Sequence, residues 1–100
     1  MMTETAHKIA FVEQGVVFIP NSQHYDSYSL YHAGKNQTII IRYSSEMSHF
    51  SAVVLPGHLN FNQFRNQYLQ LSADTFSTNA FPSEEAALEF SKLLLAPEHY

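Results

Sequence analysis

Five short stretches rich in β-branched and aromatic residues, all placed before residue 56, precede two amphipathic helical stretches in this chain of 100 residues. β-branched and aromatic residues favour strands, whereas apolar residues spaced three and four apart favour helices. Strands grouped ahead of helices are typical of α+β folds. The sequence therefore predicts one α+β domain over residues 1–100, with an antiparallel sheet of about five strands and two C-terminal helices packed on one face. Residues 1–6 and 97–100 are expected to be flexible.

The first two predicted strands, His7–Glu13 and Val16–Ile19, are separated by Gln14 and Gly15. Because glycine readily adopts the positive φ of a tight turn, a hairpin is expected at this point. The links between the later strands are short, so that a meander is the simplest topology. The remaining three strands are predicted at Ser27–His32, Gln37–Ser44 and His49–Leu55.

Asn60 begins a helical period, since Asn60 and Gln63 have the spacing of a capping box. Apolar residues then follow at intervals of three and four, which places them on one helical face. The first helix is therefore expected to run from Asn60 to about Leu71. Its apolar face consists of Phe61, Phe64, Tyr68 and Leu71.

The second helix is predicted to begin after Ser83, a natural N-cap, and to end at Pro97. Its apolar stripe consists of Ala86, Ala87, Phe90, Leu93 and Leu94. Between the helices, residues 74–81 alternate in polarity. This alternation favours a short edge strand over an extended loop.

The charge distribution argues against direct binding to nucleic acid. The formal net charge is −4, from nine acidic and five basic side chains, and the basic residues are scattered along the chain. A nucleic-acid interface needs clustered lysine and arginine to neutralise phosphates. We therefore expect no direct nucleic-acid partner.

The chain contains no cysteine, which excludes disulfides, thiolate metal ligands and a cysteine nucleophile. No uncharged apolar run approaches the ~20 residues that a membrane-spanning helix needs. The first residues also lack the basic and apolar segments of a secretory signal. We expect a cytoplasmic protein without a membrane partner.

Histidine is the side chain best suited to metal binding or acid-base chemistry in this chain, and His24, Asp26 and His32 lie close in sequence. Two histidines and a carboxylate would be acceptable zinc ligands, and His49 on a later strand could approach His32. However, no HxH or HExxH spacing fixes two ligands on one element. The glycines are isolated, so no phosphate-binding loop is present. We therefore predict no metal and no cofactor.

Signatures of catalysis are equally weak. Serine is abundant, but no Gly-x-Ser-x-Gly nucleophile turn occurs. The acidic residues Glu84, Glu85 and Glu89 lie in a predicted helix, where the positive helix start and solvation explain them better than proton transfer does. We assign no catalytic residue and favour a protein that is not an enzyme.

The aromatic content is high, with eight phenylalanines and six tyrosines but no tryptophan. Most phenylalanines occupy positions that should face the core, whereas tyrosine is enriched where protein surfaces meet. Arg42 lies in an apolar strand, where it is either a solvent-facing residue or an interface anchor. We predict Tyr25, Tyr28, Tyr31 and Arg42 as interaction residues, next to the polar loop 21–26.

The predicted sheet offers apolar side chains on both faces, with Ile39 and Ile41 on one side and Ile40 and Val54 on the other. Five strands at ~4.8 Å make a sheet about 24 Å wide, whereas two helices at ~10 Å cover about 20 Å. Two helices can therefore shield one face only. Curling of the sheet or self-association would cover the second face, and we expect a homodimer.

Two functions remain open. The first is a non-enzymatic protein-binding or regulatory accessory module, a class that includes small proteins of phages and mobile elements. The second is a small-ligand-binding protein or small enzyme, with a pocket between sheet and helices. Its predicted polar groups are His32, Tyr43 and His49.

Overall fold

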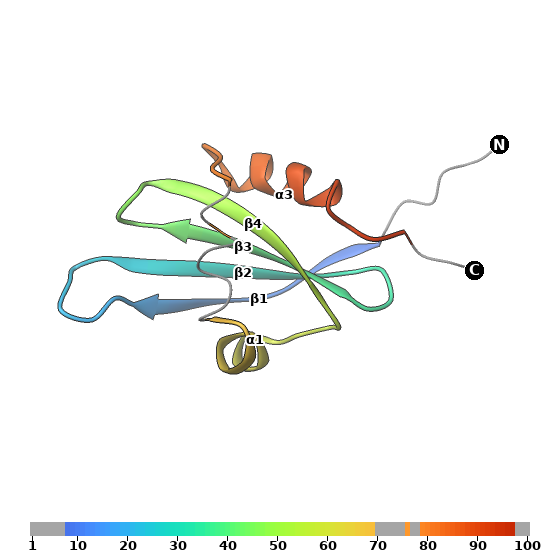
Figure 1. The fold of residues 1–100 in the computed structure, drawn as a ribbon, viewed down its shortest axis with the longest axis horizontal. Helices are drawn as coiled ribbons and strands as arrows, with labels where there is room; N and C mark the ends of the chain where they lie inside the picture. Colours follow the sequence, from blue (N-terminus) through green and yellow to red (C-terminus); the bar gives the residue numbers. More distant parts are fainter. Residues whose placement is uncertain (1–7, 70–75, 77–78, 98–100) are drawn as a thin grey trace.

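The computed structural model describes residues 8–69, 76 and 79–97. Four antiparallel strands form one sheet in the order β1-β2-β3-β4, which is a meander (Figure 1). The α+β class predicted from the sequence is thus confirmed, with four strands in place of about five. The predicted flexible ends lie outside the described residues except for Pro97. The strands are β1 (Ile9–Phe18), β2 (Tyr25–Ala33), β3 (Gln37–Ser44) and β4 (His49–Pro56), and the helices are α1 (Phe61–Gln67) and α3 (Glu84–Lys92).

The hairpin predicted at Gln14 and Gly15 is wrong, because both residues lie inside the continuous strand β1. Gly15 pairs with Tyr28 of β2, and an irregularity in the register between Phe11 and Glu13 marks a β-bulge. Glycine inside a strand often marks a close approach rather than a turn. Here a Cβ at position 15 would lie 2.5 Å from Phe61 Cζ, so the glycine leaves room for a ring of α1.

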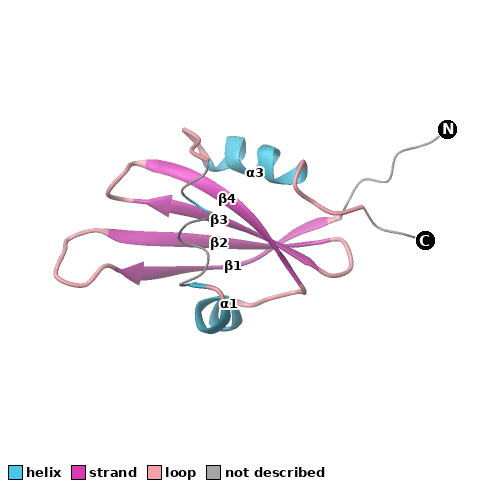
Figure 2. Cartoon of the chain, viewed as in Figure 1, coloured by secondary structure: helices cyan, strands magenta, loops and turns pink. Residues whose placement is uncertain are grey.

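The two helices lie on opposite faces of the sheet, which corrects the prediction that both pack on one face (Figure 2). The reason lies in β3, where Ile40 joins the core on the α1 side while Ile39 and Ile41 join the core on the α3 side. A strand that is apolar on both faces needs cover on both. We call these two sides of the sheet the α1 face and the α3 face.

On the α1 face, the fully buried rings of Phe64 and Phe76 pack with Tyr28, Leu30, Ile40 and Val53. Asn60 caps α1 through the predicted capping box: the Asn60 side chain accepts from Gln63 N, and the Gln63 side chain accepts from Asn60 N. The helix ends at Gln67. The predicted continuation to Leu71 extends outside the described residues.

On the α3 face, Ser83 caps the helix by accepting from Ala86 N, as the sequence predicts. Ala87 and Ser91 are the buried residues of α3. The predicted apolar stripe is wrong at its end, because the helix stops at Lys92 and leaves Leu93 and Leu94 exposed. No helix in the described part of the chain is long and apolar enough to cross a membrane.

The strand predicted at residues 74–81 can be compared with the structure only in part, because half of these residues lie outside the described ones. Phe76 is helical, and Phe81 forms one antiparallel bridge with Phe50 of β4. Beside this bridge, the Asn79 side chain bonds both backbone groups of Ala52. Residues 79–81 therefore cover part of the outer edge of β4.

Candidate binding surface

Helix α3 packs on β3 and β4 and leaves β1 and the start of β2 uncovered on the α3 face, whereas Ser29 and Ala33 further along β2 are buried (Figure 1). Side chains of β1 on this face are largely exposed: Phe11 is 58%, Val16 46% and Phe18 75% exposed. Large apolar side chains that are exposed together often mark contact sites for other molecules. We call this uncovered region the open part of the α3 face.

An aromatic row crosses all four strands near one end of the sheet. Register places Phe18 opposite Tyr25 and Tyr43 opposite Phe50, so that the rings lie on the same face. Ring centroids are 6.4 Å apart for Phe18 and Tyr25, 6.4 Å for Tyr25 and Tyr43, and 4.9 Å for Tyr43 and Phe50. The row is exposed at its β1 end and is half-buried at Phe50, next to α3.

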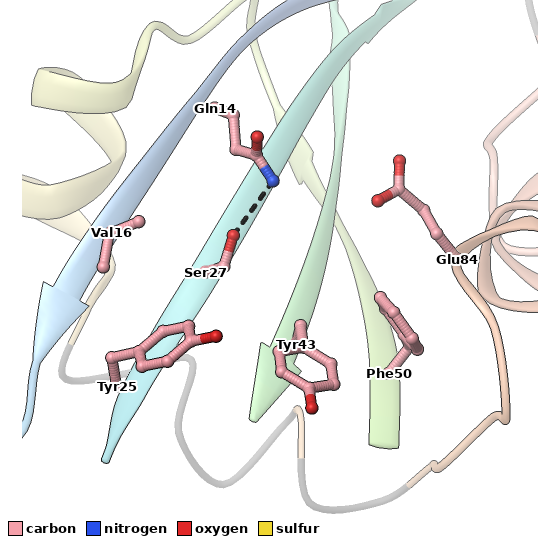
Figure 3. A pocket seen from close by; sticks show the side chains of 7 residues that line it. All are labelled: Gln14, Val16, Tyr25, Ser27, Tyr43, Phe50 and Glu84. Atoms are coloured by element: carbon pink, nitrogen blue, oxygen red, sulfur yellow. Dashed lines mark hydrogen bonds between the residues drawn. The ribbon is translucent and has the colours of Figure 1, made fainter. Parts of the chain in front are cut away.

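A cavity of about 450 Å³ opens between this row and the start of α3 (Figure 3). Glu84 extends from the helix toward the strands, and the rings of Tyr25, Tyr43 and Phe50 line the strand ends. On the floor, Gln14 Nε2 donates a hydrogen bond of 3.0 Å to Ser27 Oγ. The lining residues are Gln14, Val16, Tyr25, Ser27, Tyr43, Phe50 and Glu84.

Glu84 is held in place by two hydroxyl groups of β2. The hydroxyl of Tyr31 donates to Glu84 Oε2, and Ser29 Oγ donates to Glu84 Oε1 at 3.4 Å. Burial raises the pKa of Tyr31, and the hydrogen bond to the Glu84 carboxylate raises it further. The Tyr31 phenol therefore stays protonated and remains a donor to Glu84 at neutral pH.

The four predicted interaction residues do not share a surface. Tyr25 lies in the aromatic row, and Tyr31 lies on the same face but is engaged with Glu84. Tyr28 points to the opposite face, where it is only 4% exposed and contacts Phe64 and Phe76. Adjacent strand residues alternate between faces, which separates Tyr28 from the other two tyrosines.

Arg42 also lies on the α1 face, opposite Tyr28 in the register. Its Cζ atom lies 5.0 Å from the centre of the Phe76 ring, a cation-π contact. Burial raises the pKa of Asp26, and the charge of Arg42 opposes that rise. Arg42 thus contributes to the α1-face core and its rim rather than to the open part of the α3 face.

The three residues of the predicted polar pocket are also apart. His32 pairs with Thr38 at one end of the α1 face, whereas His49 pairs with Ser44 at the other end. Tyr43 belongs to the α3 face. His32 instead stacks on His58 with ring centroids 4.3 Å apart, and its Nε2 lies 3.0 Å from Leu59 O.

The residues weighed as metal ligands are separated in the same way. His24 lies in the β1–β2 link, Asp26 near the start of β2, and His32 near the end of that strand. Within the residues that the structure describes, no group of three histidine or acidic side chains is arranged to hold a metal ion.

Sequence reasoning missed most of the cavity lining. Phe50 came only under the general expectation that most phenylalanines face the core, and Glu84 was explained only by the helix start. One feature of the sequence could have indicated the aromatic row: each of the four strands has an aromatic residue near one end. These residues are Phe18, Tyr25, Tyr43 and Phe50. Without the strand register, this correspondence could not be recognised.

Comparison with known proteins does not identify a family for this chain. No family model, no curated protein and no solved structure matches it.

Proposed function

We propose that this protein is a non-enzymatic protein-binding module that acts in the cytoplasm and binds its partner through the open part of the α3 face. The observation that carries the proposal is the aromatic row, which ends in the 75% exposed ring of Phe18. Aromatic side chains are enriched in protein interfaces, and a few residues, among which tyrosine is enriched, provide most of the binding energy there.

The chemistry of the surface supports this proposal. The exposed side chains of β1 on this face are Phe11, Gln14, Val16 and Phe18, none of which is charged. A protein partner could therefore cover the strand without leaving a buried charge unpaired, which would cost binding energy. Depletion of charge at the centre with aromatic enrichment is the composition that protein interfaces favour.

A partner-capture experiment tests the surface. The wild-type protein and the double variant Phe18→Ser/Tyr25→Ser are immobilised, and proteins retained from the native host are quantified by mass spectrometry. The control is Leu93→Ser, which removes an 81% exposed side chain at the far end of α3. We expect the double variant to lose a specific partner at least tenfold and the control to retain it. Equal retention by both variants would reject the proposed surface.

We further propose that the protein forms a homodimer through the outer edge of β1. Hydrogen bonds from Ile19 N to His24 O and from Gly34 N to Lys8 O define which β1 residues bond to β2. Because the bonds alternate in antiparallel pairs, the backbone groups of Phe11, Val16 and Phe18 face outward. An edge whose backbone groups face outward can pair with another strand.

The exposed area agrees with a contribution from side chains as well as backbone. Phe11 exposes roughly 120 Å², taking ~200 Å² for its side chain, while Phe18 is left to the partner surface. A standard interface buries about 800 Å² per partner. Most of this area must therefore come from the backbone and the other side chains of the ten-residue strand β1. Two β1 strands paired about a two-fold axis would make one continuous sheet of eight strands.

Molar mass in solution tests the dimer. Val16→Lys places a charge beside the outward backbone groups, as natural edge strands do to prevent pairing. The control Ala10→Lys changes an exposed residue of the same strand that pairs with His32 on the α1 face. We expect the wild type and the control to have twice the monomer mass and Val16→Lys to have the monomer mass. A monomeric wild type, or a Val16→Lys dimer, would exclude this interface.

A further inference from the structure

The cavity at the start of α3 has the chemistry of a receptor for a cation. We propose that it binds an arginine side chain of the partner protein, a proposal that rests on the protein-binding function above. The guanidinium group would lie between the Glu84 carboxylate and the rings of Tyr43 and Tyr25, all of which line the cavity (Figure 3).

The first argument is the uncompensated charge of Glu84. The residue is half-buried, and the one ion pair among the described residues joins Lys92 to Glu89 instead. Tyr31 and Ser29 each use one acceptor position of the carboxylate, which has about four. The two hydroxyls thus fix the position of the carboxylate, which lines the cavity, and leave acceptor positions for a ligand.

The second argument is the aromatic lining. Tyr25, Tyr43 and Phe50 form a tilted series whose rings line the same cavity as Glu84. The face of an aromatic ring attracts a cation within about 6 Å of its centre, and arginine also stacks on such faces. An anionic or purely apolar group would gain less here, because it would leave the carboxylate without a counter-charge.

The third argument is that the neutral polar groups can accept hydrogen bonds. Gln14 uses its amide nitrogen to bond Ser27, which leaves its amide oxygen as an acceptor on the floor. Arginine has five N–H donors and no acceptor, so it matches a site of several separate acceptors. Lysine carries a compact charge that would reach fewer of these groups at once. The volume of about 450 Å³ lies within the range of ligand sites and accommodates the side chain.

A titration followed by NMR tests the site directly. The probe is N-acetyl-arginine amide, and the neutral comparison is N-acetyl-citrulline amide, which has nearly the same shape. We expect saturable shifts of the Ser27, Tyr43 and Phe50 amide signals with the arginine probe, and at least tenfold weaker binding of the citrulline probe. Equal responses to the two probes, or no response to the arginine probe, would overturn the proposal.

Matched variants then test the residue that carries the charge. Glu84→Gln removes the charge with little change in shape, whereas Glu85→Gln removes a charge from the same helical turn at an exposed position outside the cavity. We expect Glu84→Gln to weaken binding of the arginine probe at least fivefold and Glu85→Gln to leave it unchanged. A retained affinity in Glu84→Gln would exclude the carboxylate as the cation receptor.

A second variant guards against loss of folding. Tyr43→Leu removes one aromatic wall while Glu84 and its hydroxyl donors remain. It should also weaken arginine binding, with an unfolding transition still present by circular dichroism; unchanged binding would reject the aromatic contribution.

Failure of this inference is distinguishable from failure of the proposed function. If Phe18→Ser/Tyr25→Ser loses the partner while Glu84→Gln retains it, the protein-binding surface stands and the arginine site falls.

Discussion

The ring of Phe61 in α1 occupies the space next to Gly15 in β1 where any other residue would carry its Cβ, at 2.5 Å from Phe61 Cζ. This contact sets how closely α1 approaches the sheet. Phe61 N also donates to Glu13 Oε2 at 2.8 Å, so the helix start is attached to β1 at two neighbouring positions. These two contacts therefore fix the position of α1 relative to the bulged strand β1.

Replacing this glycine should loosen the attachment. We expect Gly15→Ala to lower the free energy of unfolding by about 1–2 kcal/mol, since overpacking costs about 1–3 kcal/mol and the lower backbone entropy of alanine offsets part of it. Urea denaturation measures the change. In the background of Phe61→Ala, the same substitution should be neutral or stabilising, because the clashing ring is gone. A loss of equal size in both backgrounds would contradict this account.

Thr38 joins β3 to the link before α1 and is fully buried. Its Oγ1 donates to Gly57 O at 2.6 Å and accepts from Leu59 N at 2.9 Å. Thr38→Val keeps the shape but leaves both backbone groups without this partner, so we expect a loss of about 2 kcal/mol in unfolding free energy. Thr38→Ser keeps the hydroxyl and should lose less than about 1 kcal/mol. Chemical denaturation would refute the assignment if the serine variant were the less stable of the two.

Asn79 binds the outer edge of β4 through both atoms of its amide. Oδ1 accepts from Ala52 N at 2.9 Å, and Nδ2 donates to Ala52 O at 3.1 Å. We expect Asn79→Ala to cost about 1–2 kcal/mol and to accelerate hydrogen exchange of the Ala52 amide. The control Asn36→Ala changes an exposed asparagine in the β2–β3 turn and should leave that exchange rate unaltered. Unchanged Ala52 exchange in the Asn79 variant would show that the edge is protected in another way.

The α1-face core should make the protein sensitive to alkaline pH. Burial, followed by the charge of Asp26, raises the pKa of Tyr28 from 10.0 to about 12. Between these two values the unfolded tyrosine is ionised while the folded one still holds its proton, so stability falls as the pH rises. The pKa of Tyr31 is also raised, by burial and then by its hydrogen bond to Glu84, so this residue likewise lowers the stability of the folded state as the pH rises.

Tyr28→Phe removes one titrating group and should reduce the loss of stability between pH 8 and pH 11. Urea denaturation of wild type and variant across this range provides the test. At pH 8 the variant should be less stable by about 1 kcal/mol, because the polar interaction of the Tyr28 hydroxyl with the Asp26 carboxylate is lost. An identical decline in both proteins would show that Tyr28 does not contribute to the alkaline transition.

Local sequence patterns determined much of the secondary structure. Asn60 with Gln63, and Ser83 before two glutamates, marked both helix starts correctly, because a cap depends on residues within one turn. The bounds of β3 were also predicted correctly, since consecutive β-branched residues favour a strand whatever surrounds them. Gly15 was misassigned because the same residue type serves a turn or a close contact, and only the distant Phe61 distinguishes the two.

The sequence by itself determined the α+β class, the order of the elements and the apolar character of both faces of β3. Only the tertiary structure decided that α1 and α3 take opposite faces, and that Glu84 approaches the aromatic row. The physical reason is that capping and strand propensity act between near neighbours in the chain. The open part of the α3 face instead depends on strand register and on which strands a helix covers, and these are set by packing between residues far apart in sequence.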